Sequence, residues 1–530
     1  MLYRFNNIKL DIEVDCNHVF DVVTDKFSPV LLKNMRIVKK SLDARKKDKL
    51  CFVYAVEFET DEDLELNDDL LKIDKVDDID VSCLKWIYDD RPVVIGSGPS
   101  GMMAGILLAE IGAKPIIIER GDCVDVRKQK VDDFWYNNKL DINSNVQFGE
   151  GGAGTFSDGK LMTGIKKDRF VKKVIDEFIK AGAPEEIKYL AKPHIGTDNL
   201  VLMVKNIRKK IESLGGEYRF LETLCDIKIE DNSIVSAVIK KSDGSLYEIE
   251  TKHIFLGIGH SARDTFKMLY DRGVYMTQKP FAVGCRIEHL QSEINLSQYG
   301  RKYCNSPYLG ASDYKLAVHL GNNRSVYTFC MCPGGKVVGA TSLEGHVVTN
   351  GMSEFARDLE NANSAVLVNV DERDFGSNYP LAGIEFQEKL EKRAFVLGGQ
   401  DYFAPVQKVG DFIKGRASKS LGKVKPTYLP GVRCADFKKL FDAPIYEALQ
   451  KGIKLMSNKL KGFDDEDAVL TAVETRSSSP VRIVRDEGYQ ANIRGLYPIG
   501  EGAGYAGGIT SASADALKVV LMGVSKSAVK

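Results

Sequence analysis

A glycine-rich turn at residues 96–101 combines residue types and spacing that suit a phosphate-containing ligand. It follows the short apolar run Pro92–Ile95 and precedes a stretch of helical character, Met102–Ile111. In such a turn the first glycine permits a tight bend, the second lets backbone N–H groups approach a pyrophosphate, and the third allows the helix to pack closely on the strand. The helix N-terminus then faces the phosphate charge. The pattern predicts a dinucleotide site formed by Gly96, Gly98, Pro99, Ser100 and Gly101.

An acidic residue follows at the place where a dinucleotide site needs one. The apolar run Pro115–Ile118 ends in Glu119, and Arg120 stands next to it. We expect the Glu119 carboxylate to accept hydrogen bonds from both ribose hydroxyls of an adenosine half and to repel a 2′-phosphate. NADP is therefore not expected in this site, whereas NAD and FAD both remain compatible with it.

The elements that position these residues form a Rossmann-like α/β unit. The two apolar runs are too short for helices and read as buried strands, so the segment from Pro92 to Glu119 predicts a strand–helix–strand unit with a parallel sheet. Residues 197–215 have helical apolar spacing. Three further strands, at 224–229, 234–239 and 247–256, are separated by the turn signals Asp231-Asn232 and Asp243-Gly244 and predict an antiparallel meander.

Two more glycine-rich segments are candidates for close approach of the backbone to a ligand. Residues 149–161 hold many small residues with interleaved Phe156 and Leu161, unlike a flexible linker. Residues 495–509 combine an apolar run, a glycine-flanked acid and a turn before a helix from Ser511. These two segments and the turn after the strand that ends at Leu256 supply the remaining predicted cofactor contacts. The contacts are Gly152, Gly154, Thr155, Gly259, Gly500, Glu501, Gly507, Gly508 and Ile509.

Two side chains are predicted to carry chemistry. His260 follows a strand in a glycine-rich turn, and its ordinary pKa near neutrality suits a proton carrier. Cys330 and Cys332 stand in Cys-Met-Cys-Pro-Gly-Gly; we expect one of these thiols to face the cofactor and assign Cys332. Both residues also have a purely structural interpretation, as a turn histidine and a small buried hydrophobe. No other cysteine or histidine has zinc-ligand spacing, so no metal is expected.

Over nearly its whole length the sequence resembles a family of uncharacterised FAD-dependent dehydrogenases of the glutathione-reductase-type, two-dinucleotide-fold flavoprotein superfamily. The motifs that carry the resemblance lie at residues 96–101, 149–161, 192–198, 257–264, 330–335, 475–480 and 500–508. The resemblance implies bound FAD, an acid at 501 that binds the ribitol, and a helix opening at 507–509 that faces the flavin pyrimidine. The usual acid is Asp, and this chain has Glu501. The family does not fix a substrate.

Composition limits the remaining choices. The chain has 530 residues, 74 basic and 74 acidic side chains, 44% hydrophobic residues and ten cysteines. The zero net charge excludes a global field for polyanions, and no apolar run is long enough to span a bilayer. The opening residues lack an export signal and the thiols suit a reducing compartment, so a cytoplasmic protein is expected. We divide the chain into an α+β module (1–88), an FAD-binding domain (89–275 and 471–530) and an inserted α+β substrate domain (276–470).

These observations predict an FAD-dependent oxidoreductase acting on a small organic substrate. No second glycine-rich dinucleotide unit lies between 160 and 490, so either NADH or NADPH docks transiently or another donor reduces the flavin. Two alternatives stay open. One is a flavin-dependent RNA-modifying enzyme that uses residues 1–88 and the basic loop Lys414–Lys425; the other is a non-catalytic flavin-binding or sensor protein. The oligomeric state is not assigned.

Overall fold

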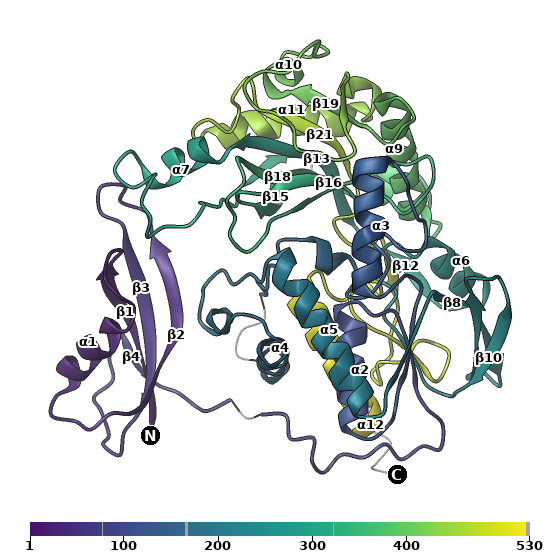
Figure 1. Ribbon diagram of the computed structural model, residues 1–530, viewed down its shortest axis with the longest axis horizontal. Helices are drawn as coiled ribbons and strands as arrows, with labels where there is room; N and C mark the ends of the chain where they lie inside the picture. Colours follow the sequence, from purple (N-terminus) through teal and green to yellow (C-terminus); the bar gives the residue numbers. More distant parts are fainter. Residues whose placement is uncertain (77, 165–167, 322, 526–530) are drawn as a thin grey trace.

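The computed structural model describes residues 1–76, 78–164, 168–321 and 323–525, and Figure 1 shows their arrangement. A four-stranded sheet near the N-terminus stands to one side. A seven-stranded sheet lies above the helices that cover a five-stranded sheet. The predicted combination of a parallel sheet with antiparallel strands is confirmed.

The five-stranded sheet is parallel in every pairing, in the order β23-β11-β5-β6-β7. Its strands are β5 (Val93–Ile95), β6 (Ile116–Glu119), β7 (Glu217–Phe220), β11 (Ile254–Leu256) and β23 (Leu496–Pro498). Because parallel strands end at the same edge of a sheet, the turns after β5, β6, β11 and β23 are brought together there. Segments from both ends of the sequence therefore meet at one edge.

Helices cover this sheet and bury its apolar side chains. They are α2 (Pro99–Glu110), α3 (Val124–Asn137), α4 (Arg169–Lys180), α5 (Thr197–Ser213), α6 (Arg263–Asp271) and α12 (Ile509–Ser525), with the 3₁₀ turns Ala153–Phe156 and Glu185–Lys188. Figure 1 shows α2, α5 and α12 side by side. The helix expected from Met102 begins at Pro99 instead, since a proline with its fixed φ fits the first helical position.

The antiparallel meander contains β8 (Glu222–Glu230), β9 (Ser233–Lys241) and β10 (Leu246–Glu250). The single strand expected over 247–256 was wrong, because the chain bends after Glu250. Asp90 accepts a hydrogen bond from the Lys252 N–H, and the Thr251 hydroxyl accepts one from the His253 N–H. After this bend β11 leaves the meander and enters the parallel sheet.

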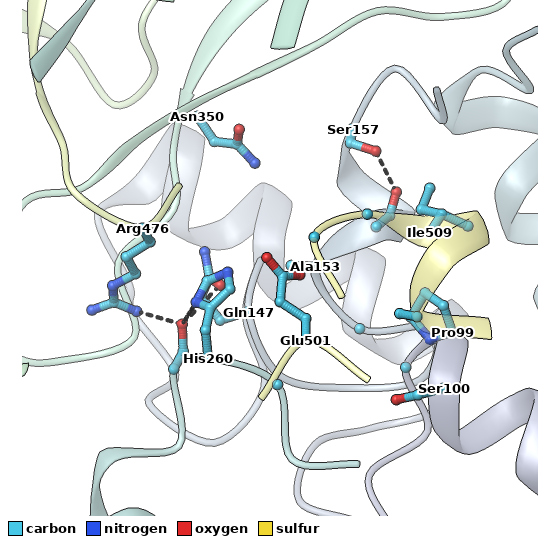
Figure 2. A pocket seen from close by; sticks show the side chains of 18 of the residues that line it. Pro99, Ser100, Gln147, Ala153, Ser157, His260, Asn350, Arg476, Glu501 and Ile509 are labelled. Carbon is cyan, nitrogen blue, oxygen red and sulfur yellow. Dashed lines mark hydrogen bonds between the residues drawn. The ribbon is translucent and has the colours of Figure 1, made fainter. Parts of the chain in front are cut away.

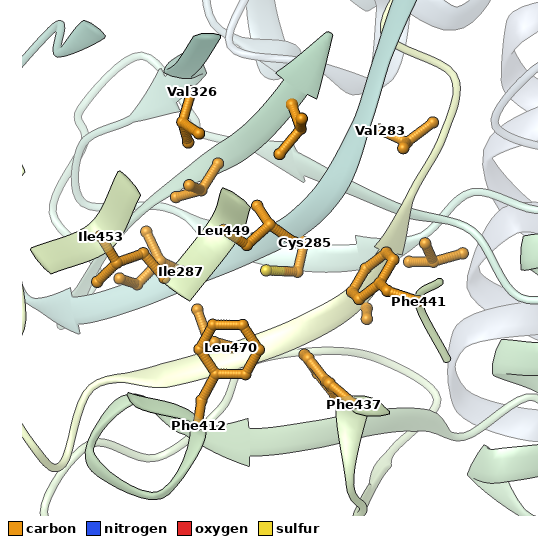
Figure 3. Packing of buried hydrophobic residues seen from close by; sticks show 14 of the residues in the cluster. Val283, Cys285, Ile287, Val326, Phe412, Phe437, Phe441, Leu449, Ile453 and Leu470 are labelled. Atoms are coloured by element: carbon orange, nitrogen blue, oxygen red, sulfur yellow. The ribbon is translucent and has the colours of Figure 1, made fainter. Parts of the chain in front are cut away.

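The seven-stranded sheet has the order β14-β15-β18-β13-β21-β19-β20 and is antiparallel except for the last pair. Its strands are β13 (Phe281–Leu290), β14 (Ala317–Gly321), β15 (Arg324–Cys332), β18 (Asn361–Val370), β19 (Ala404–Lys408), β20 (Val432–Cys434) and β21 (Val469–Glu474). In its core, Leu449 and Ile453 of helix α11 (Ala443–Ser457) pack against Cys285 and Ile287 of β13 (Figure 3). Removal of this apolar surface from water stabilises the layer.

The elements that surround this sheet are mostly helical. They are α7 (Gln291–Tyr299), α8 (Glu372–Phe375), α9 (Ala382–Gly398), α10 (Val409–Ile413), α11 (Ala443–Ser457) and the 3₁₀ turn Phe437–Lys439. Two small ladders pair β12 (Met276–Gln278) with β22 (Val481–Ile483) and β16 (Lys336–Gly339) with β17 (Thr349–Met352). The expected division at residue 470 falls inside β21. As domain boundaries, residues 88, 275 and 470 stay predictions.

The N-terminal sheet has the order β2-β3-β1-β4 and packs against one helix. Its elements are β1 (Leu2–Asp11), α1 (His18–Phe27), β2 (Lys33–Asp43), β3 (Cys51–Glu59) and β4 (Leu70–Lys72). Helix α1 ends at Phe27, because Pro29 disfavours helical backbone at Ser28. The Lys40 N–H donates to the Tyr189 carbonyl at 2.7 Å and so joins β2 to the rest of the chain.

Candidate cofactor site

The three motif glycines of the turn after β5 have different local roles. Gly96 has a φ of +88°, and a Cβ built on it would lie 2.4 Å from the Gly257 carbonyl oxygen. A Cβ on Gly101 would lie 1.9 Å from the Gly96 carbonyl oxygen. A Cβ on Gly98 would lie 3.8 Å from its nearest described neighbour, the Cα of Gly152. The fold itself therefore requires Gly96 and Gly101, whereas Gly98 faces open space.

That open space is part of a cavity of about 490 Å³. Its wall includes most of the predicted contacts, namely Gly96, Gly98, Pro99, Ser100, Glu119, Arg120, Gly152, Gly154, Gly259, His260, Glu501, Gly507, Gly508 and Ile509. Figure 2 shows Pro99 and Ile509 on one side, His260 and Arg476 on the other, and Glu501 between them. The volume lies within the range that small-molecule and cofactor sites occupy.

Four predicted residues are not on the cavity wall. Gly101 is packed against Gly96, and the Thr155 hydroxyl lies against the Glu150 carbonyl. The Gly500 N–H donates to Asp515, and a Cβ at Gly500 would lie 2.6 Å from the Cβ of Ser100. Cys332 has no exposed surface and is absent from the wall, which includes Cys330 instead. The assignment of the facing thiol to Cys332 is therefore corrected to Cys330.

Two helix N-termini open toward the cavity. Helix α2 begins behind Gly98, and within the described residues no side chain caps it. Helix α12 begins at Ile509 behind Gly507, and a Cβ at Gly507 would meet no described atom within 4 Å. The first N–H groups of a helix lack intrahelical acceptors and carry partial positive charge. The wall thus offers two places at which backbone donors meet a negatively charged or electron-rich group.

The Glu119 carboxylate is already engaged by the protein on both oxygens. Its Oε2 accepts from the N–H and the hydroxyl of Ser97, both at 2.8 Å, and its Oε1 accepts from the N–H groups of Gly121 and Gly149 at 3.0 and 2.9 Å. Four acceptor sites are about what a carboxylate has. Glu119 therefore joins three turns at the cavity wall through hydrogen bonds. The expectation that its carboxylate is free to accept from two ribose hydroxyls was wrong, because protein donors already occupy both oxygens.

Arg120 is held next to Glu119 by two contacts. One guanidinium nitrogen lies 2.8 Å from the Asp264 carboxylate, and the guanidinium carbon lies 4.5 Å from the centre of the Phe148 ring. Charge pairing and cation–π contact fix the plane of the side chain along the cavity. The ring of Phe148 also lines the cavity.

Glu501 is the acidic side chain nearest the middle of the view in Figure 2. Burial raises its pKa to about 7, and Lys279 opposes this shift only in part. The carboxyl group therefore changes charge near neutral pH, unlike an ordinary surface glutamate.

His260 belongs to a hydrogen-bonded chain on the opposite side. Its Nδ1 lies 3.0 Å from the Ser261 hydroxyl, which also contacts Gln147 and accepts from the Arg476 guanidinium at 3.2 Å (Figure 2). Burial, with the positive charges of Arg476 and Arg263, lowers the pKa of His260 to about 3. The imidazole is therefore neutral at neutral pH, and the expectation of a near-neutral pKa was wrong.

Several wall residues were not singled out from the sequence. They are Gln147, Phe148, Lys160, Asn350, Glu474 and Arg476. The sequence did contain a hint of the roles of Lys160 and Arg476, because they lie in the motif segments 149–161 and 475–480. Asn350 and Glu474 come from β17 and the end of β21, where no sequence pattern marks a ligand.

The basic loop proposed for RNA contact is extensively paired with acidic groups. Lys414 lies 2.7 Å from Glu466, and Arg416 lies 2.7 Å from Asp411. Lys423 contacts both Glu293 and Asp465. These carboxylates neutralise much of the local charge that phosphate binding would use.

The described residues hold neither a metal-type cluster nor a helix suited to a membrane. Within residues 1–76, 78–164, 168–321 and 323–525, no three His, Cys, Asp or Glu side chains are grouped as a metal would need. In the same ranges, every helix is too short or too polar to cross a lipid bilayer.

Comparison with known proteins gives one extensive sequence match. An uncharacterised protein of Clostridium beijerinckii is 46% identical over 98% of this chain and 98% of its own. Residues 280–477 match a family model described as FAD-dependent protein, C-terminal domain-like. Among solved structures, a flavoprotein/dehydrogenase from Cytophaga hutchinsonii is 12% identical over 83% of this chain and 79% of its own, with a TM-score of 0.36. The 3-ketosteroid-delta4-(5alpha)-dehydrogenase of Rhodococcus jostii RHA1 is 12% identical over 84% and 98%, with a TM-score of 0.36.

Proposed function

We propose that the protein is an FAD-dependent oxidoreductase acting on an organic substrate. The chain belongs to the same family as the Clostridium beijerinckii protein, and its residues 280–477 match the model of the C-terminal domain of FAD-dependent proteins. The two glycine-rich segments, 96–101 and 500–508, support its placement among glutathione-reductase-type flavoproteins. The ten free cysteines support a reducing compartment such as the cytoplasm.

The observation that supports the proposal is the wall of the cavity of about 490 Å³. Gly98, Gly259 and Gly507 all present bare backbone to it, and a Cβ on any of them would meet no described atom closer than 3.8 Å. Protein packing does not account for glycine at Gly98, whose φ of −70° suits any residue. A ligand that passes close to the backbone does account for it. The residues present therefore fit an extended dinucleotide.

Each part of the wall suits one part of FAD. Arg120 would hold the adenosine end with its remaining donors, beside the turns that Glu119 joins. Gly98 and the start of α2 would hold the pyrophosphate, and Gly507, Gly508 and Ile509 would lie at the flavin. When bound, FAD would supply the capacity for hydride or electron transfer.

The surrounding side chains orient groups and hold protons. The N–H groups at the opening of α12 would favour negative charge on the part of the ligand nearest to them. His260 is neutral and is oriented by Ser261, so at neutral pH it accepts or donates a hydrogen bond as a neutral ring. Glu501 holds a proton below about pH 7 and carries negative charge above it.

A flavin enzyme needs an electron donor and a route by which its substrate reaches the flavin. We propose that NADH or NADPH docks transiently or that another donor reduces the flavin, and that the substrate enters at the wall formed by Lys160, Lys192 and Phe329. These residues combine positive charge with a partly exposed aromatic ring.

An absorption spectrum of the freshly purified protein tests the proposal. We expect a flavin spectrum that bleaches under argon when the donor is added and returns when a substrate or oxygen is admitted. Colourless protein that does not take up FAD offered in excess would contradict the assignment of the cavity. A flavin-loaded protein that no donor reduces would instead indicate a flavin-binding or sensor protein.

A further inference from the structure

Cys330 lies at an irregular point of the cavity wall. In the pairing of β15 with β18, Phe329 is opposite Ala365 and Cys332 is opposite Asn363, so Cys330 and Met331 together face one residue. Cys330 has a φ of +43°, an unusual backbone conformation for any residue other than glycine. β-Bulges and strained backbone of this kind are over-represented next to active sites. The bulge places Cys330 on the wall.

The second thiol lies directly behind the first. Cys332 is fully buried, and its Sγ is 3.3 Å from the Cys330 carbonyl oxygen. The Cys332 side chain is therefore turned back toward Cys330, two positions earlier in the chain. The two cysteines thus form a pair in which one member contacts the cavity and the other is shielded from it.

Two cations flank the pair. Lys160 donates to the carbonyl of Met331, the residue between the cysteines, and lies 2.8 Å from Asp158. Arg286 has no exposed surface and donates to the Cys330 carbonyl at 3.0 Å. Its guanidinium also pairs with Glu474 through two contacts of 2.8 and 2.9 Å.

This environment makes the two thiols unequal. The hydrogen bond from Cys332 lowers the pKa of Cys330 well below its usual value, and Lys160 and Arg286 act in the same direction against the effects of burial and Asp158. The same hydrogen bond and burial raise the pKa of Cys332. A thiolate next to a protonated thiol is the arrangement required for dithiol oxidation.

We propose that Cys330 and Cys332 form a dithiol–disulfide couple in which Cys330, on the cavity wall, is the reacting thiolate. For its electron acceptor the inference rests on the proposed function, that is, on bound FAD. Oxidation forms the bond between the two sulfur atoms and breaks the S–H bond of Cys332. Two electrons and that one proton pass to oxidised flavin, which becomes the reduced anion. The charges and hydrogen atoms then balance.

An anaerobic reductive titration of the flavin-loaded protein tests the couple. The oxidised wild-type protein is titrated with dithionite, and electrons consumed are counted per flavin. We expect the wild type to consume two more electrons per flavin than Cys330→Ser, because the disulfide is a two-electron acceptor. Cys434→Ser serves as the matched control, since Cys434 is exposed and is absent from the cavity wall. Equal consumption by the wild type and Cys330→Ser overturns the proposal.

A measurement without flavin separates this inference from the proposed function. Peptide mass spectrometry of the oxidised chain, alkylated before and after reduction, should show a Cys330–Cys332 disulfide. Iodoacetamide should label reduced Cys330 at a lower pH than it labels the exposed Cys434, whose pKa is raised by partial burial. A disulfide in protein that never binds FAD contradicts only the proposed function. Flavin-loaded protein with both thiols always free contradicts only the couple. Cys330→Ala and Cys332→Ser repeat the test if Cys330→Ser folds poorly.

Discussion

Arg476 and Glu391 are joined inside the protein by two charge-assisted hydrogen bonds, Nε to Oε1 at 3.1 Å and Nη2 to Oε2 at 2.9 Å. Glu391 also pairs with Arg263 at 3.0 Å, and Arg476 donates to Ser342 at 2.7 Å. The pair joins α9 to the segment after β21, so that Arg476 is fixed where it lines the cavity. Burial alone would raise the pKa of Glu391, but the two arginines lower it to about 2.

Replacement of Glu391 by Gln should therefore destabilise the protein by about 3 kcal/mol, because it leaves buried arginines without their counter-charge. The folded-state pKa lies below the ordinary one, so this contribution is present above about pH 4.5 and is lost as the pH falls toward 2. Urea unfolding at several pH values measures it. Glu388→Gln is the control, since Glu388 is 38% exposed and forms an ion pair of 3.2 Å with Arg263. Equal losses in the two variants would refute the role of the buried pair.

Alanine substitutions in the glycine-rich turn should separate folding from cofactor retention. Gly98→Ala should leave the melting temperature nearly unchanged and lower the flavin content, since its Cβ enters the cavity without a clash. Gly101→Ala should destabilise the fold by roughly 2 kcal/mol or more, because its Cβ would lie 1.9 Å from the Gly96 carbonyl oxygen. The ratio of flavin to protein absorbance and thermal unfolding measure the two effects. A fully loaded, yellow Gly98→Val protein would contradict the position assigned to the pyrophosphate.

Glu119→Ala should weaken the fold as well as the cofactor site. The substitution removes the acceptor for three backbone N–H groups and the Ser97 hydroxyl. We expect a loss of about 2 to 3 kcal/mol in the unfolding free energy of the FAD-free protein, since buried donors would lose their partner. Ser97→Ala removes only the hydroxyl contact and should cost about 1 kcal/mol. If Glu119→Ala lowered FAD affinity without lowering the unfolding free energy, Glu119 would instead have the simpler role of binding the ribose.

The charge of Glu501 should make stability depend on pH near neutrality. Its folded-state pKa of about 7 lies above the ordinary value, so its contribution is complete below about pH 4.5 and is lost as the pH rises through 7. Between about pH 5 and about pH 8, FAD-free wild type should lose roughly 3 kcal/mol more than Glu501→Gln. The exposed Glu344→Gln serves as control and should follow the wild type. Parallel pH profiles for wild type and Glu501→Gln would show that residue 501 does not titrate in this range.

The local sequence was enough to predict the strand–turn–helix unit around Gly96–Gly101 and the acid that ends β6. Both follow from short-range constraints: a tight bend requires glycine, a short apolar run suits a buried strand, and a helix needs a compatible first turn. Periodicity also predicted α5 and the first two meander strands. It failed at residues 247–256, because the bend there is held by Asp90, a residue far away in the chain.

The state of the candidate site was decided only by tertiary structure. His260 lies in a turn that sequence placed correctly, yet its pKa depends on Arg476 and on burial by distant elements. Cys330 rather than Cys332 reaches the wall because β15 is bulged against β18, and Lys160 and Arg286 come from other segments. Backbone geometry near one residue is encoded locally, whereas burial and electrostatic fields are sums over groups that only the folded chain brings together.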